Sequence, residues 1–243
     1  MRFTSRTSSD GVLEQLFTLD EIPGVLWTPD DAPGTRPLIL MGHGGGQHKK
    51  APAILARARH FVTEGGFAVA AIDVPNHGER PRSEKFDRIA AELRARMDAG
   101  EDPAPLVATM QSLAAGQVVP EWQAVLTALQ RLDHVGRGPV GYWGVSLGCG
   151  LGVPFVAAEP RVGAAVLGLQ GSPALAETAT RITVPVQFLV QWDDERVPRA
   201  HSLALFEAFA SAEKTMHANP GKHGDLPRFE MDDALRFFIR QLG

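Results

Sequence analysis

Short apolar runs alternate along the chain with longer stretches in which apolar residues recur at helical spacing. Such alternation is typical of a sheet whose strands are joined by helices. Buried strands are predicted at 37–41, 67–72, 139–145, 162–169 and 184–191, and helices at 51–64, 121–132, 147–158, 200–210 and 232–242. Residues 12–19 and 22–28 predict two strands joined at a turn, and residues 214–218 predict a further strand. We therefore expect an α/β fold with a mainly parallel central sheet and helices on both faces.

Residues 82–118 interrupt this alternation with helical stretches at 86–97 and 105–113 that are rich in Arg, Glu and Ala. The insert lies between the end of a strand and the next helix of the sheet, where inserted segments commonly become lids. We interpret it as a small helical cap over one edge of the sheet, and residues 1–243 as a single domain.

Composition and charge narrow the class of protein. The chain has 243 residues, of which 44% are hydrophobic, enough for a sizeable core. A net charge of −4, a pI near 6.1 and the lack of a basic run argue against nucleic acid as a partner. The first residues are polar and no apolar run is long enough to span a bilayer, so we expect neither a secretory signal nor a membrane partner. The single Cys149 cannot form an intrachain disulfide, and we expect a reduced, cytoplasmic setting.

The most informative motif is Gly144-x-Ser146-x-Gly148, which joins the predicted strand 139–145 to the predicted helix 147–158. A serine hydroxyl becomes a useful nucleophile only when it is held exposed beside a base and an oxyanion site. A sharp turn between strand and helix exposes it, and small residues on either side let the backbone make that turn. The pattern favours a serine hydrolase; the alternative is a glycine-rich turn with an idle serine.

Four further motifs accompany this one in a fixed order along the chain. They are His43-Gly44-Gly45-Gly46, Asp73-x-x-x-His77-Gly78, Asp194-x-x-Val197-Pro198 and Gly221-Lys222-His223-Gly224. Together they resemble the α/β-hydrolase superfamily over nearly the whole chain, and within it the dienelactone hydrolase and prolyl-oligopeptidase-like branch of small esterases. The resemblance implies an α/β-hydrolase fold. The chain departs from dienelactone hydrolases at the nucleophile, where those enzymes carry cysteine and this sequence has Ser146.

The resemblance also implies three catalytic side chains in the chain order serine, acid, histidine. Ser146 is the expected nucleophile, and His223 is the expected base because it lies in a glycine-flanked loop after the last predicted strand. Asp194 is the expected acid that orients the imidazole, with Asp193 as the alternative, because a one-residue shift of the loop would exchange them. Either aspartate could instead cap the helix that begins near Pro198.

Backbone N–H groups are the expected oxyanion donors. Leu147, directly after the nucleophile, supplies one donor in this fold, and Gly45 and Gly46 supply others in esterases with a His-Gly-Gly-Gly loop. The glycine loop has neither Walker nor dinucleotide spacing, which argues against a phosphate cradle. The chain has no His-Glu-x-x-His motif and no cysteine pair, so we expect no metal and no other cofactor.

These residues predict a serine hydrolase of the carboxylesterase class that cleaves a small acyl ester through an acyl-enzyme. A peptidase, thioesterase, lactonase or acyltransferase with the same triad is an alternative. An alternative of another class is a catalytically silent ligand-binding module on a hydrolase scaffold. The expected partner is a small-molecule ester, in a pocket lined by the insert and by residues 170–173. The sequence leaves the acyl and alcohol specificity and the oligomeric state open.

Overall fold

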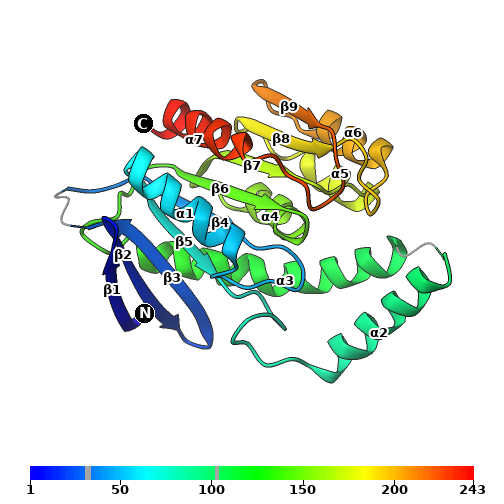
Figure 1. Cartoon of the computed structure of the whole chain (residues 1–243), viewed down its shortest axis with the longest axis horizontal. Coiled ribbons are helices and arrows are strands. Elements are labelled where there is room, and N and C mark those ends of the chain that lie inside the picture. The colour runs from blue at the N-terminus through cyan, green and yellow to red at the C-terminus, as the bar shows by residue number, and fades with distance from the viewer. Residues whose placement is uncertain (31–33, 102–103) are drawn as a thin grey trace.

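A nine-stranded sheet forms the centre of the part of the chain that the computed structural model describes, residues 1–30, 34–101 and 104–243 (Figure 1). The strand order is β1-β2-β3-β5-β4-β6-β7-β8-β9. The strands span Arg2–Ser9 (β1), Val12–Leu19 (β2), Ile22–Pro29 (β3), Leu38–Gly42 (β4), Ala68–Ile72 (β5), Val140–Val145 (β6), Val162–Gly168 (β7), Val186–Gln191 (β8) and Lys214–Asn219 (β9). The pairs β1–β2, β2–β3 and β3–β5 are antiparallel. The remaining pairs, which join β5, β4, β6, β7, β8 and β9 in that order, are parallel. The predicted mainly parallel sheet is confirmed.

Helices cover both faces of this sheet (Figure 1). They span Pro52–Gly65 (α1), Glu84–Asp98 (α2), Ala104–Leu129 (α3), Leu147–Ala158 (α4), Pro173–Ala179 (α5), Arg199–Ala208 (α6) and Phe229–Leu242 (α7). The helices α1 and α7 contribute Phe61 and Phe238 to the core on one face. The core on the other face takes residues from α3, α4, α5 and α6, among them Trp122 and Phe155.

Alternation within the strands explains why they appear in the sequence as continuous apolar runs. Along β4, Leu38 and Leu40 belong to one core cluster, whereas Ile39 and Met41 belong to the other. Successive side chains of a strand point to opposite faces, and here helices cover both faces. Every position of such a strand is therefore buried, and period two is lost from the hydrophobic pattern. The strand β1 was not predicted, because all its residues are exposed and nothing in its pattern distinguishes it from a polar tail.

Two helices occupy the insert at 82–118, and one of them differs from the prediction. The sequence predicts separate helices at 105–113 and 121–132, but α3 continues without a break from Ala104 to Leu129, so that boundary is wrong. Its C-terminal half buries Val118, Trp122 and Leu126 against the sheet. This packing carries the helix through Pro120, despite the backbone hydrogen bond that proline removes. The cap role of the insert and the single-domain division stay predictions.

The parallel strands bring the predicted site residues to one edge of the sheet. The loops that follow β4, β6, β8 and β9 carry, in this order, residues 43–46, Ser146, Asp194 and His223. The carboxyl ends of parallel strands meet at the same edge, which is where open α/β sheets bind their ligands. Within the described ranges, no helix combines the length and apolar character that crossing a bilayer requires.

Candidate active site

Ser146 occupies a strained turn between β6 and α4. Its backbone has φ of 55° and ψ of −121°, a conformation that side-chain-bearing residues rarely adopt. The flanking glycines make the turn possible. A Cβ added to Gly148 would lie 2.5 Å from the carbonyl oxygen of Gly42, and one added to Gly144 would lie 2.6 Å from that of Gly148. The motif is thus explained by close backbone approach on both sides of the serine.

His223 lies between Ser146 and Asp194. Its Nε2 is 2.9 Å from Ser146 Oγ, and its Nδ1 is 2.8 Å from Asp194 Oδ2. An ionised carboxylate only accepts hydrogen bonds, so Nδ1–H donates to Asp194 and the free Nε2 accepts from the serine hydroxyl. The imidazole and the carboxylate are both nearly buried. In this arrangement Nε2 can take a proton from the hydroxyl.

Asp194 is held by its own loop as well. Its Oδ1 accepts the backbone N–H groups of Arg196 at 2.8 Å and Val197 at 3.0 Å. The helix α6 begins beyond this turn, at Arg199, and its N-cap residue is Pro198. The carboxylate therefore does not cap the helix; it braces a tight turn with one oxygen and holds the imidazole with the other.

Asp193, the alternative acid, contacts the main chain of the histidine loop at Gly221 instead of the imidazole. Its N–H donates to the carbonyl of Gly221 at 3.2 Å, and its carboxylate accepts the N–H of Gly221 at 3.3 Å. The next acidic residue, Glu195, accepts the backbone N–H of His223 at 3.0 Å. That hydrogen bond lowers the pKa of the Glu195 carboxyl. This contact of Glu195 could not be predicted, because nothing in the sequence shows which of three adjacent acids faces which atom.

Two of the predicted oxyanion donors, Leu147 and Gly45, are neighbours. Leu147 is the first residue of α4, and the first N–H groups of a helix have no partner within it. A Cβ placed on Gly45 would lie 4.0 Å from the Cβ of Leu147, so these two residues are neighbours. Gly46 has φ of 71°, a backbone conformation that favours glycine. The N–H of Gln47 donates to the carbonyl of Gly44 at 3.2 Å and closes the turn.

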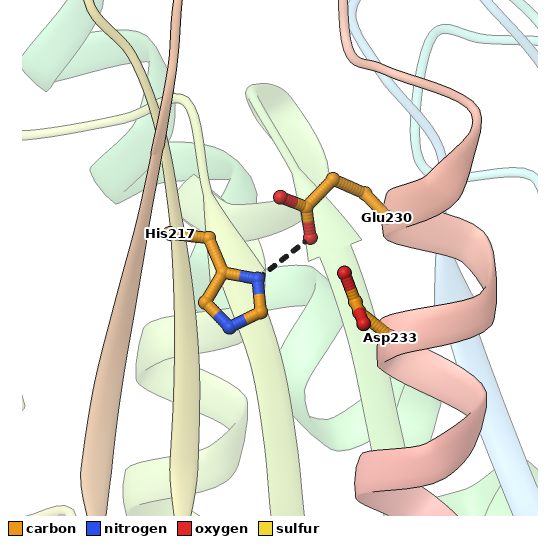
Figure 2. Close-up of side chains that lie close together, drawn as sticks. All are labelled: His217, Glu230 and Asp233. Carbon is orange, nitrogen blue, oxygen red and sulfur yellow. Dashed lines mark hydrogen bonds and ion pairs between the residues drawn. The ribbon is translucent and has the colours of Figure 1, made fainter.

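A second cluster lies on the strand and helix that flank the histidine loop (Figure 2). Among the described residues, His217, Glu230 and Asp233 offer ligand atoms within 4.8 Å of one another. His217 and Glu230 pair with each other, and neighbouring side chains contact the two carboxylates. His217 Nδ1 lies 2.8 Å from Glu230 Oε2, Asn219 donates to Glu230 Oε1 at 2.7 Å, and Asp233 pairs with Arg236. The cluster therefore joins β9 to α7, and we assign no metal to it.

A cavity of about 220 Å³ lies between the insert and the body of the molecule. Its wall includes Ala115 of α3, Gly150 and Pro154 of α4, and Leu175 of α5. Gly150 lies in the first turn of α4, four residues after Ser146. Ser172 also lines this cavity. That the insert and residues 170–173 form the substrate pocket stays a prediction.

No protein-family model and no curated protein matches the chain, but several solved structures are similar to it. A cold-adapted esterase from an Arctic intertidal metagenomic library, in a PEG-bound complex, is 32% identical over all of both chains with a TM-score of 0.82. Est1E from Butyrivibrio proteoclasticus, with ferulic acid bound, is 17% identical over 93% of this chain and 98% of its own, with a TM-score of 0.70. An acetyl xylan esterase from Paenibacillus sp. R4 is 16% identical over 99% of this chain and 88% of its own, with a TM-score of 0.67. The last two share the fold.

Proposed function

The chain belongs to the α/β-hydrolase superfamily and acts on carboxylic esters, and we propose that it does so as a serine carboxylesterase, through an acyl-enzyme formed on Ser146. The observation that carries the proposal is the unbroken chain of contacts from Ser146 Oγ to His223 Nε2 and from His223 Nδ1 to Asp194 Oδ2, at 2.9 and 2.8 Å. These groups come from three loops far apart in the sequence. Membership of the dienelactone hydrolase-like branch stays a prediction.

In the acylation step, Ser146 Oγ forms a bond to the ester carbonyl carbon while its proton passes to His223 Nε2. The carbonyl π electrons move to oxygen, which becomes an oxyanion. The amides of Leu147, Gly45 and Gly46 are the proposed donors to that oxyanion. Asp194 accepts the Nδ1–H of His223 and stabilises the imidazolium that forms.

In the second half of the reaction, the tetrahedral intermediate collapses and the imidazolium gives its proton to the departing alkoxide. The alcohol leaves and water enters. His223 takes a proton from water as the water oxygen attacks the acyl carbon, and collapse of that intermediate returns the proton to Ser146 Oγ and releases the carboxylic acid. Each half of the cycle thus uses the same base and the same donors.

Replacement of the nucleophile tests this proposal. We expect Ser146→Ala to lower kcat for p-nitrophenyl acetate by several orders of magnitude, because the acyl-enzyme can no longer form. A fluorophosphonate probe should label the wild-type protein on Ser146 and leave the variant unlabelled. Full activity in a folded Ser146→Ala variant would show that another residue carries the chemistry.

The same experiments separate the alternatives. A catalytically silent binding module would remain unlabelled by the probe although folded. A panel of amide, thioester and lactone substrates, with and without acceptor alcohols, would distinguish a peptidase, thioesterase, lactonase or acyltransferase from an esterase. We favour esters, because the solved structure that is 32% identical to this chain over all of both chains is that of an esterase. A cytoplasmic setting is part of the same proposal, and the one cysteine, Cys149, is buried with its thiol pKa raised to about 12 by desolvation.

A further inference from the structure

Two buried contacts join the loop after β4 to the loop after β5, and together they bracket the predicted oxyanion glycines. The first contact is at the start of the β4 loop. The side chain of His43 is buried, its Nδ1 lies 2.9 Å from the carbonyl of Gly44, and its Nε2 accepts the N–H of Val74 at 3.3 Å. Burial lowers the pKa of His43 to about 4, so the ring is neutral near pH 7 and keeps this acceptor.

The second contact is a buried ion pair at the end of the same loop. Lys49 is 3% exposed and Asp73 is 0% exposed. The Lys49 ammonium donates to Asp73 Oδ2 at 2.7 Å, and the Lys49 backbone N–H donates to Asp73 Oδ1 at 2.7 Å. A single carboxylate thus fixes both the side chain and the main chain of Lys49. The ammonium also reaches Glu79, whose side chain is largely exposed.

The Asp73 carboxylate is enclosed by the chain that follows it. Asp73 Oδ2 also accepts the N–H of Glu79 at 3.0 Å. Burial would raise the pKa of Asp73, but the hydrogen bonds from Glu79 and Lys49 outweigh burial and hold it below its ordinary value. Gly78 has φ of 58°, and a Cβ there would lie 2.2 Å from Asp73 Cγ. The backbone wraps so closely around this carboxylate that it leaves no room for a ligand, which indicates a structural role for the pair.

Between these two contacts lie Gly44, Gly45 and Gly46, which have no side chains with which to fix their own conformation. The N–H of Gly44 donates to Gln47 Oε1 at 3.3 Å, whereas the directions of the Gly45 and Gly46 N–H groups depend on where the ends of the loop are held. We propose that Lys49 and Asp73 are positioning residues that hold the β4 loop so that the amides of Gly45 and Gly46 point at the developing oxyanion. This inference rests on the proposed function.

Oxyanion donors act only when they are oriented before the reaction, and a displacement of about 1 Å can cost roughly 100-fold in rate. Loss of the pair should therefore slow the chemical step far more than it weakens substrate binding. We expect Lys49→Met to lower kcat for p-nitrophenyl acetate by roughly 10- to 100-fold, with KM changed by less than about twofold. The double variant K49M/D73N should show the same loss. It leaves no unpaired buried charge, so we expect it to be more stable than the single variant, in which the Asp73 carboxylate is buried without its partner.

Glu79→Gln is the matched control, because it alters the exposed partner of the same ammonium and leaves the buried pair intact. Its kcat should stay within about twofold of the wild-type value. Each kcat is calculated from the concentration of active sites titrated with the fluorophosphonate probe. A variant with a smaller folded fraction therefore does not give a falsely low kcat. A trifluoromethyl ketone, whose adduct with the serine carries an oxyanion, should bind the Lys49 variants more weakly by the same factor as kcat/KM falls.

The outcomes are distinct. Unchanged kcat per titrated site in a folded K49M/D73N variant, or a loss confined to KM, would overturn the inference and leave the proposed function standing. Failure of the wild-type protein to be labelled on Ser146 would overturn the proposed function and this inference with it. A parallel loss in kcat/KM and in affinity for the trifluoromethyl ketone, with Glu79→Gln near wild type, supports both.

Discussion

His43 begins the glycine loop, and its burial has a consequence for stability. Burial lowers its pKa from 6.5 to about 4, so between these values the unfolded chain binds a proton that the folded protein excludes. The stability that neutral His43 contributes is therefore complete above about pH 6.5 and is lost as the pH falls toward 4. A pKa difference of this size corresponds to about 3 kcal/mol. The sequence places His43 at the start of the glycine loop, but it cannot show burial, which depends on packing beneath the loop.

We expect His43→Gln to be less sensitive to acid than the wild type over this range, since glutamine can accept the N–H of Val74 without titrating. Urea denaturation at pH 7.5 and pH 4.5 measures the free energy of unfolding of both proteins. The free energy of unfolding of the wild type minus that of the variant should be roughly 2–3 kcal/mol smaller at pH 4.5 than at pH 7.5. Asp73, His48 and His77 lie close enough for their charges to act on His43, and both proteins contain all three. Parallel pH profiles for the two proteins would contradict this account.

At the scale of elements, the ends of the histidine loop are held together by one buried carboxylate. Glu230, near the start of α7, is 1% exposed and accepts a hydrogen bond from His217 of β9 (Figure 2). It also accepts one from Asn219 of the same strand. The loop that carries His223 runs between these two elements. Arg57 of α1, also buried, lies close enough for its charge to interact with that of Glu230. Glu230 therefore ties β9 to α7.

Removal of this carboxylate should destabilise the protein. Glu230→Ala would leave the amide of Asn219 and the charge of Arg57 without their buried partner, and we expect a loss of about 3 kcal/mol in the free energy of unfolding. Asp233→Asn is the control, because Asp233 pairs with Arg236 near the surface, and such pairs contribute less than about 1 kcal/mol. Urea denaturation of both variants measures the difference. If the Glu230→Ala variant is as stable as the control, Glu230 does not stabilise the contact between β9 and α7.

Which elements could be predicted depended on what surrounds them. The parallel strands were recognisable because both their faces are buried, as along β4, where Leu38 to Met41 are all apolar. The strand β1 has no buried face, and so it gave no signal. The role of Lys49 was not foreseen, since its partner Asp73 is 24 residues away and only the pairing of β4 with β5 brings them together. Asp194 and Asp193 differ by one position in a loop, and the choice between them needs side-chain directions.

At the scale of the whole molecule, the chain order of the motifs reflects topology. Parallel strands joined by helices place every following loop at one edge, so the motifs and their order predict that the loops of Ser146 and His223 meet an acidic loop there, without deciding between Asp193 and Asp194. The pocket could not, because its shape depends on how three helices pack. The cavity between α3, α4 and α5 lies beside the helix that begins after Ser146, and apolar groups such as Ala115 and Leu175 line it. We predict that the acyl chain of an ester enters this cavity.

Filling this cavity should therefore change which esters react. We expect Ala115→Phe to lower kcat/KM for p-nitrophenyl hexanoate roughly tenfold more than for the acetate, since each methylene group in an apolar pocket is worth about 1 kcal/mol or more. Leu113→Ala is the control on the same helix, because Leu113 is 53% exposed and does not line the cavity. Its preference between the two esters should match that of the wild type. The acetyl group is too short to reach the volume that the new side chain fills, so the acetate should be affected less. An equal loss of kcat/KM for both esters would show that the acyl chain binds elsewhere.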